Sequence, residues 1–174
     1  VSLAIGGISM LIAVFLGVTL GIFAALRQNS FVDYFVMLLG NMGSAVPSFV
    51  LGPIMIIIFA IGLKWLPAGG WNDFELRFLV LPIALLTIIN VSTIGRVMRG
   101  SLIEVMHSNF IRTARAKGLP TRVVVLRHAL KPALLPVVSV LGPLAISSIT
   151  SALVTETVFS LPGLGKLIVN GAGN

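Results

Sequence analysis

The chain has 174 residues, of which 57% are hydrophobic and only 10% charged, with twelve Lys and Arg against five Asp and Glu. A mean hydropathy of +1.09 excludes an ordinary water-soluble globular domain and predicts that lipid surrounds most of the chain. The absence of cysteine from the sequence excludes disulfides, thiolate metal sites and cysteine nucleophiles.

Four uncharged runs are long enough to be membrane spans, because a hydrocarbon core about 30 Å thick needs roughly 20 apolar helical residues. They cover residues 1–26, 34–63, 78–95 and 132–155. The third run is slightly short, and we expect its helix to extend past Arg96, whose side chain would snorkel. The pattern predicts an all-α fold, a polytopic transmembrane helical bundle with about four spans, in a single domain over residues 1–174.

The ends of the chain indicate a piece of a longer protein. The sequence opens on Val1 inside an apolar run, without the basic region and cleavage site of a signal peptide, and closes in a Gly-rich polar tail. We therefore expect a first span and a last span to lie outside residues 1–174.

The second run contains GNMGSAVPSFVLGP, residues 40–53. Proline removes a backbone donor and clashes one turn back, which predicts a kink or break near Pro47. Two interpretations are equally favoured: close helix packing through small residues, or a pliable helix that lines a pore. The second would make Pro47 and Ser48 pore or gate residues.

Residues 64–77 are predicted to form an outside loop, with Trp65 and Trp71 as interfacial anchors. In the run that follows, Asn90 is the most polar residue and a pore candidate. An asparagine in a span more often hydrogen-bonds to a neighbouring helix, and this alternative stays open.

Residues 96–131 carry eight Lys and Arg and one acid, a net charge of +7, whereas the rest of the chain sums to zero. Inserting eight cations at roughly 2.5 kcal/mol each would cost about 20 kcal/mol, so this segment cannot span. The excess of Lys and Arg predicts a cytoplasmic loop, with the turn at residues 27–33 on the same side and the loop at 64–77 on the other. Nucleic-acid binding is disfavoured because no aromatic platform accompanies the charge.

Within this loop, Ser101 and Glu104 fit a capping box that would begin a helix. Gly118 and Pro120 predict its end near Lys117, and a second helix should run from about Thr121 into the last span. Taken as one helix, the loop has an apolar stripe opposite a polar one. The apolar stripe is Ile103, Met106, Phe110 and Ala114, and the polar stripe is Ser101, Ser108, Arg112 and Arg115.

Two roles of this amphipathic segment are equally favoured on physical grounds. A basic helix in a membrane protein often lies on anionic headgroups. The small residues Ala114, Ala116 and Gly118 instead suit insertion into a groove on a partner protein.

The last run is rich in hydroxyls, including Ser147, which either bond to neighbouring backbone or line a polar path. Glu156 follows at its outer end, and together these residues are pore or gate candidates. Leu-Pro-Gly-Leu-Gly at 161–165 is typical of a turn and predicts an outer, re-entrant loop.

Four segments resemble the dipeptide and oligopeptide permease branch of bacterial ATP-binding cassette importers: SNFIRTARAKGLPTRVVVLRHALKPALLPVV, ETVFSLPGLG, ALRQNSFVDY and SAVPSFVLGP. The first is similar to the cytoplasmic loop that docks on the ATPase. The broader superfamily has Glu-Ala-Ala where this chain has Arg112, Thr113 and Ala114, a substitution that the peptide branch tolerates.

The resemblance implies a multi-pass permease subunit of the bacterial inner membrane, without catalytic residues or a metal site of its own. The implied partners are a second permease, two ATPase subunits that bind ATP and magnesium, and an external peptide-binding protein. Nickel and glutathione are alternative cargoes. The residues implied in ATPase coupling are Phe110, Arg112, Ala114, Arg115, Ala116, Lys117 and Gly118.

Two other classes of protein fit less well. The sequence lacks the His-Glu-x-x-His motif of an intramembrane zinc protease, because its two histidines, His107 and His128, are 21 positions apart. The sequence has no phosphate-binding glycine loop, so another chain would have to bind ATP. An ion-coupled secondary transporter usually carries a charge within its spans, and the four runs have none.

Overall fold

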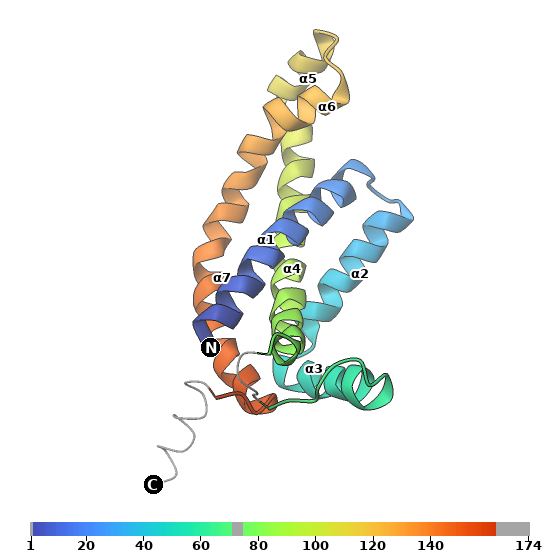
Figure 1. Cartoon of the computed structure of the whole chain (residues 1–174). Coiled ribbons are helices and arrows are strands. Elements are labelled where there is room, and N and C mark those ends of the chain that lie inside the picture. Colours follow the sequence, from blue (N-terminus) through green and yellow to red (C-terminus); the bar gives the residue numbers. More distant parts are fainter. Residues whose placement is uncertain (1, 71–74, 163–174) are drawn as a thin grey trace.

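The computed structural model describes residues 2–70 and 75–162, which form helices and no strands. The helical bundle predicted from the sequence is confirmed (Figure 1). The elements are α1 (Ser2–Leu26), α2 (Phe31–Ala45), α3 (Ser48–Met55), the π-helical η1 (Ile56–Gly62), α4 (Arg77–Met106), α5 (Asn109–Ala116), α6 (Thr121–Val123), the π-helical η2 (Val124–Ala129) and α7 (Leu130–Val158).

Among the described residues, three helices are long and apolar enough to cross a membrane: α1, α4 and the continuous helix of residues 121–158. The run at 34–63, expected as a further span, is divided instead into α2 and the 15-residue helix Ser48–Gly62. Pro47 separates them with an extended ψ of 144°. The kink or break predicted near this proline is confirmed, whereas neither of the two helices in this run is long enough by itself to be counted among the spans.

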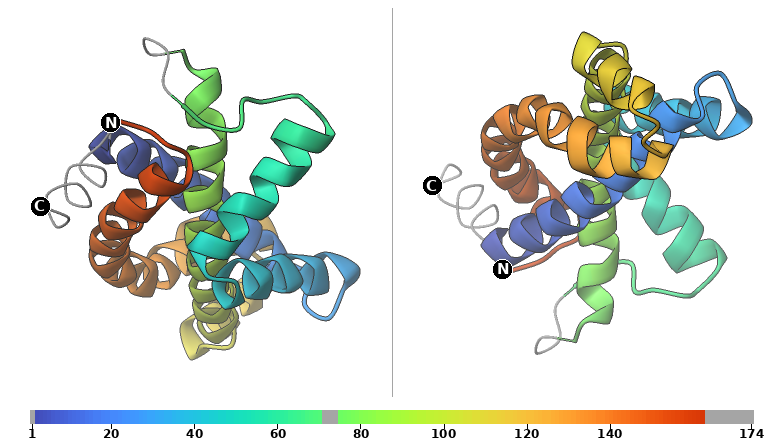
Figure 2. Two further views of the ribbon diagram at one scale, coloured as in Figure 1. Left: turned by 90° about the horizontal axis from the view of Figure 1, so that it is seen from below. Right: turned by 90° about the horizontal axis from the view of Figure 1, so that it is seen from above.

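Helix α4 is the centre of the bundle and contacts α1, α2, α3, η2 and α7. Figure 2 shows α7 on one side of α4 and α2 with α3 on the other. Buried small residues recur at every fourth position along the face of α1 that meets α4: Ser9, Ala13, Gly17, Gly21 and Ala25. Such residues let two helix backbones approach closely, which is how helices associate where lipid supplies no hydrophobic drive.

The turn at residues 27–30, the end of α4 and the segment α5–α6 lie toward one end of the bundle (Figure 1). Residue 2, the start of α4 and the end of α7 lie toward the other. The pairing of the 27–33 turn with the basic loop at one end, expected from charge, therefore agrees with the fold. The described part of the loop between η1 and α4 lies at the opposite end, as expected; Trp71 falls outside the described residues.

Candidate functional site

The basic loop begins later than expected. Ser101 lies inside α4, which continues to Met106, so the predicted capping box is wrong. Leu102, one residue on, is fully buried in the core, and this packing outweighs the local capping signal. The helix ends at Met106 with His107 as its C-cap, and Ser108 adopts an extended conformation before α5 begins.

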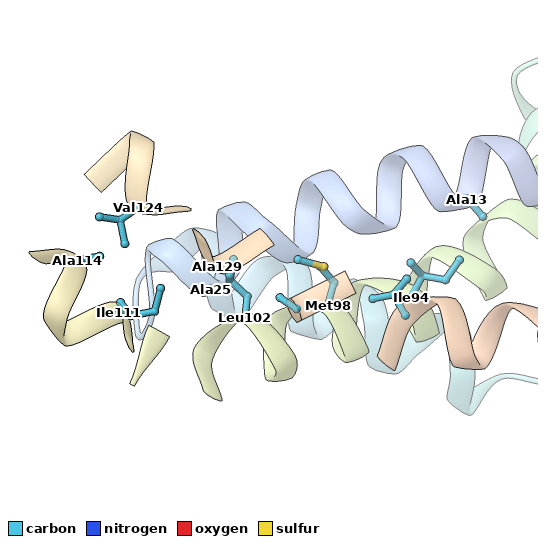
Figure 3. Packing of buried hydrophobic residues seen from close by; sticks show 11 residues of the cluster. Ala13, Ala25, Ile94, Met98, Leu102, Ile111, Ala114, Val124 and Ala129 are labelled. Atoms are coloured by element: carbon cyan, nitrogen blue, oxygen red, sulfur yellow. The ribbon is translucent and has the colours of Figure 1, made fainter. Parts of the chain in front are cut away.

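Helix α5 is seated on the bundle through Ile111 and Ala114, which are 0% and 7% exposed. They belong to the same buried cluster as Val124 of η2 and Leu102 of α4 (Figure 3). The predicted apolar stripe assumed one helix, but the bend at residues 107–108 changes which side of α5 faces the bundle. The stripe is therefore wrong at Phe110, whose side chain is 51% exposed. The core of the bundle thus continues without interruption into the loop.

The opposite face of α5 is exposed and basic. The residues expected to couple to an ATPase lie exposed on α5 or in the turn after it, except Ala114, which packs inward against its own chain. The exposed ones are Phe110, Arg112, Arg115, Ala116, Lys117 and Gly118.

The turn after α5 depends on Gly118, whose φ of +76° is a conformation that side-chain-bearing residues rarely adopt. Its N–H donates to the carbonyl of Arg115 at 2.9 Å, and Pro120 precedes the first residue of α6. The predicted end near Lys117 and restart at Thr121 are both confirmed. A Cβ added at Gly118 would meet nothing within 4 Å, so the turn projects into open space.

An ion pair with a buried carboxylate and a partly exposed arginine, missed by the sequence reasoning, lies at the same end of the bundle. Arg99 of α4 donates from Nε and Nη2 to the two carboxylate oxygens of Asp33 at 2.5 and 2.6 Å, and the Asn29 N–H donates at 3.0 Å. Asp33 is only 2% exposed. The hydrogen bonds from Arg99 lower the pKa of the Asp33 carboxyl below its ordinary 3.8, so it is ionised at neutral pH.

A second arginine of α4 also reaches α2. Arg96 donates from Nη2 to the carbonyl of Gly40 at 3.2 Å. The expected extension of α4 past Arg96 is confirmed, and the side chain contacts the neighbouring helix.

The pore candidates do not gather at one place. Asn90 is buried and donates to Ser148 of α7 at 2.8 Å, the interhelical role left open above. Ser147 is exposed, as is Pro47, and Ser48 is half-buried. Whether any of these residues lines a pore stays a prediction.

Glu156 lies inside the last helix, not beyond it, because α7 continues to Val158. It is fully buried and accepts a hydrogen bond from the hydroxyl of Ser2. The helix is therefore longer at this end than the uncharged run 132–155, and it includes a buried acid. Residues 159–162 leave the helix as predicted, and the rest of the expected outer loop falls outside the described residues.

Comparison of the sequence with known proteins assigns the chain to a family. Residues 17–174 match the family model described as "Binding-protein-dependent transport system inner membrane component". The oligopeptide transport system permease protein OppB of Escherichia coli (strain K12) is 55% identical over 174 residues, covering 100% of this chain and 57% of that protein. The dipeptide transport system permease protein DppB of Bacillus subtilis (strain 168) is 42% identical over 169 residues, covering 97% of this chain and 54% of that protein.

The chain thus spans between half and three fifths of the length of these relatives. The match includes the basic loop, the turn at Gly118 and the long helix that follows them. The chain belongs to the family of binding-protein-dependent transport system inner membrane components.

Proposed function

We propose that the protein is a multi-pass permease of the bacterial inner membrane that imports peptides with energy from ATP bound by separate subunits. The observation that carries the proposal is the 55% identity, over all 174 residues, to a protein named as an oligopeptide transport permease. The three membrane-length helices and the net charge of +7 in residues 96–131 support it. That charge favours a cytoplasmic location for the loop.

In this proposal, the exposed face of α5 and the turn at Gly118 bind an ATPase subunit. Phe110 supplies an exposed aromatic side chain, and Arg112, Arg115 and Lys117 supply exposed positive charge on α5 and the turn after it. The inner face of α5 shares a buried cluster with η2 and α4. Close-packed side chains resist compression, so helices that share a packed cluster tend to move together. A displacement of α5 would therefore move the start of the 121–158 helix with it.

The transport cycle then follows from a shift between two states. Closure of two ATPase subunits on ATP would pull α5 and favour one arrangement of the spanning helices over the other. The proposed partners are a second permease, two ATPase subunits with ATP and magnesium, and an external peptide-binding protein. Competition of labelled peptide uptake by dipeptides, longer peptides, glutathione and nickel would identify the cargo class.

Replacing Gly118 with Leu is expected to uncouple transport. The variant G118L adds bulk to the proposed contact and strains a backbone of φ +76°. Overpacking costs about 1–3 kcal/mol, which corresponds to a loss of peptide uptake per ATP hydrolysed of about fivefold to about 150-fold. The measurement is uptake and ATP hydrolysis in vesicles that contain the full-length protein with its ATPase subunits and binding protein.

The matched control is G100L, because Gly100 is exposed on α4 and a Cβ there also meets nothing within 4 Å, but its helical backbone accepts leucine. We expect both variants to insert normally and G100L to transport as the wild type does. Wild-type uptake by G118L would remove the turn from the coupling site.

A further inference from the structure

A partly open cavity of about 340 Å³ lies among α1, α2, α3, η1 and α4. Figure 1 shows α1 and α2 diverging from their common turn, and both helices contribute residues to the lining of the cavity. Its walls include Leu20 of α1, Val36 and Met37 of α2 and Phe59 of η1. The lining is apolar apart from three side chains among the described residues, Thr87, Ser92 and Arg96.

The interior of the cavity suits a hydrocarbon and disfavours a peptide. The hydroxyls of Thr87 and Ser92 donate to the carbonyls of Ser9 and Ile88, at 3.4 and 2.7 Å, inside the protein. The amides of a peptide would be desolvated against aliphatic walls, at a cost of several kcal/mol in lipid.

The size of the cavity also selects the ligand. A helix with its side chains is about 10–12 Å across and rises about 5.4 Å per turn, so a single turn occupies more than the volume of this cavity. An apolar cavity of about 150 Å³ accepts one benzene, so 340 Å³ accommodates about a dozen carbon atoms by the same proportion. That is the larger part of one acyl chain.

The rim of the cavity adds a positive charge at one end. Arg96 is exposed and lies where the basic segment 96–131 begins, so it marks the end of the cavity nearest the side predicted to be cytoplasmic. Its hydrogen bond to the Gly40 carbonyl holds the guanidinium against the α2 wall. The cytoplasmic leaflet carries the anionic lipids, whose phosphates attract cations at that depth.

We propose that this cavity binds one acyl chain of an anionic phospholipid from the cytoplasmic leaflet, with the headgroup phosphate beside Arg96. The acyl chain fills the space between α1 and α2, and the charge of Arg96 selects the headgroup. The site is independent of the coupling surface on α5 and of the identity of the cargo.

The test is native mass spectrometry of the full-length protein in mild detergent, titrated with phosphatidylglycerol or with phosphatidylcholine of the same acyl chains. We expect one site that prefers phosphatidylglycerol about fivefold, the effect of one basic residue near a phosphate. R96Q should abolish this preference and leave acyl binding, whereas R127Q, which removes an exposed cation of the same loop, should keep it.

Two cavity-filling variants test the acyl site from opposite walls. V36F and L20F should each lose binding of both lipids by tenfold or more, with an unchanged melting temperature. The matched control L38F places the same ring on α2 at a side chain that is 57% exposed and does not line the cavity, and it should bind as the wild type does.

Three results would overturn the proposal. Lipid binding by V36F and L20F at the wild-type level would show that the lipid binds elsewhere on the surface. Displacement of phosphatidylglycerol by a tripeptide would assign the cavity to the substrate path. A structure of the assembled transporter in which protein side chains fill the cavity would assign it to a subunit contact.

Discussion

Replacing Arg99 with Met is expected to lower the free energy of unfolding by about 3 kcal/mol, because the Asp33 carboxylate would stay buried without its counter-charge. Arg99 makes two short hydrogen bonds to that carboxylate, and of the contacts described here the Asn29 N–H would remain. The free energy is measurable from the loss of helical circular dichroism of the full-length protein as the fraction of denaturing detergent rises.

The double variant D33L/R99M is the matched control, since removing both charges of a buried pair costs far less than removing one. It should recover most of the loss. Because the folded pKa of Asp33 is lowered, the ion pair stabilises the wild type above the ordinary carboxyl pKa, and this stabilisation falls as pH drops through the lowered value. R99M should lack that acid-dependent loss. The prediction would be contradicted if R99M had the same free energy of unfolding as the wild type, or if D33L/R99M were no more stable than R99M.

The features that the sequence predicted well depend on local chemistry. Pro47 breaks the second run, and the backbone donor that proline lacks favours such a break. It does not require one, because Pro53, Pro82, Pro136 and Pro143 lie inside helices. Gly118 and Pro120 end one helix and begin the next for equally local reasons. Length and hydropathy alone were enough for α1, α4 and the 121–158 helix, because the thickness of a bilayer sets the length of a span.

The features that the sequence reasoning missed depend on tertiary contacts. The capping signal at Ser101 was overridden by the burial of Leu102, and the bend at residues 107–108 changed which residues of α5 face inward. Asp33 and Arg99 are 66 positions apart, and nothing in a single sequence joins them. A usable signal was present nonetheless, because the acid Asp33 and the cation Arg99 fall in two segments, 27–33 and 96–131, that were both predicted to lie on the cytoplasmic side.

Most of the candidate coupling surface could be placed from composition and turn chemistry. The exposed cations and Gly118 lie as expected, whereas the inward packing of Ala114 required the position of η2. The pore candidates had weaker grounds, since a hydroxyl or an asparagine in a span has two roles that only a neighbouring helix separates. For Asn90 the neighbour is Ser148.

The second large effect is expected where α1 meets α4, on replacing Gly21 with Leu. A Cβ at Gly21 would lie 2.7 Å from the Gly95 carbonyl oxygen and from the Cβ of Met98. The carbonyl belongs to the backbone and cannot rotate away, so α1 and α4 must separate along their contact. Overpacking costs about 1–3 kcal/mol, and we expect about 3 kcal/mol here because two backbones must move. The same detergent titration measures the loss.

The control for G21L is G7L on the same helix. Gly7 is exposed, and a Cβ there would meet nothing within 4 Å, so leucine should change the free energy of unfolding by less than about 0.5 kcal/mol. G21A distinguishes the effect of the close approach from the effect of a large side chain. Its single methyl would already lie 2.7 Å from the Gly95 carbonyl oxygen, so G21A should destabilise the protein more than G7L does. If G21L unfolds at the same detergent fraction as G7L, the two helices do not approach at Gly21 as closely as the buried row on α1 implies.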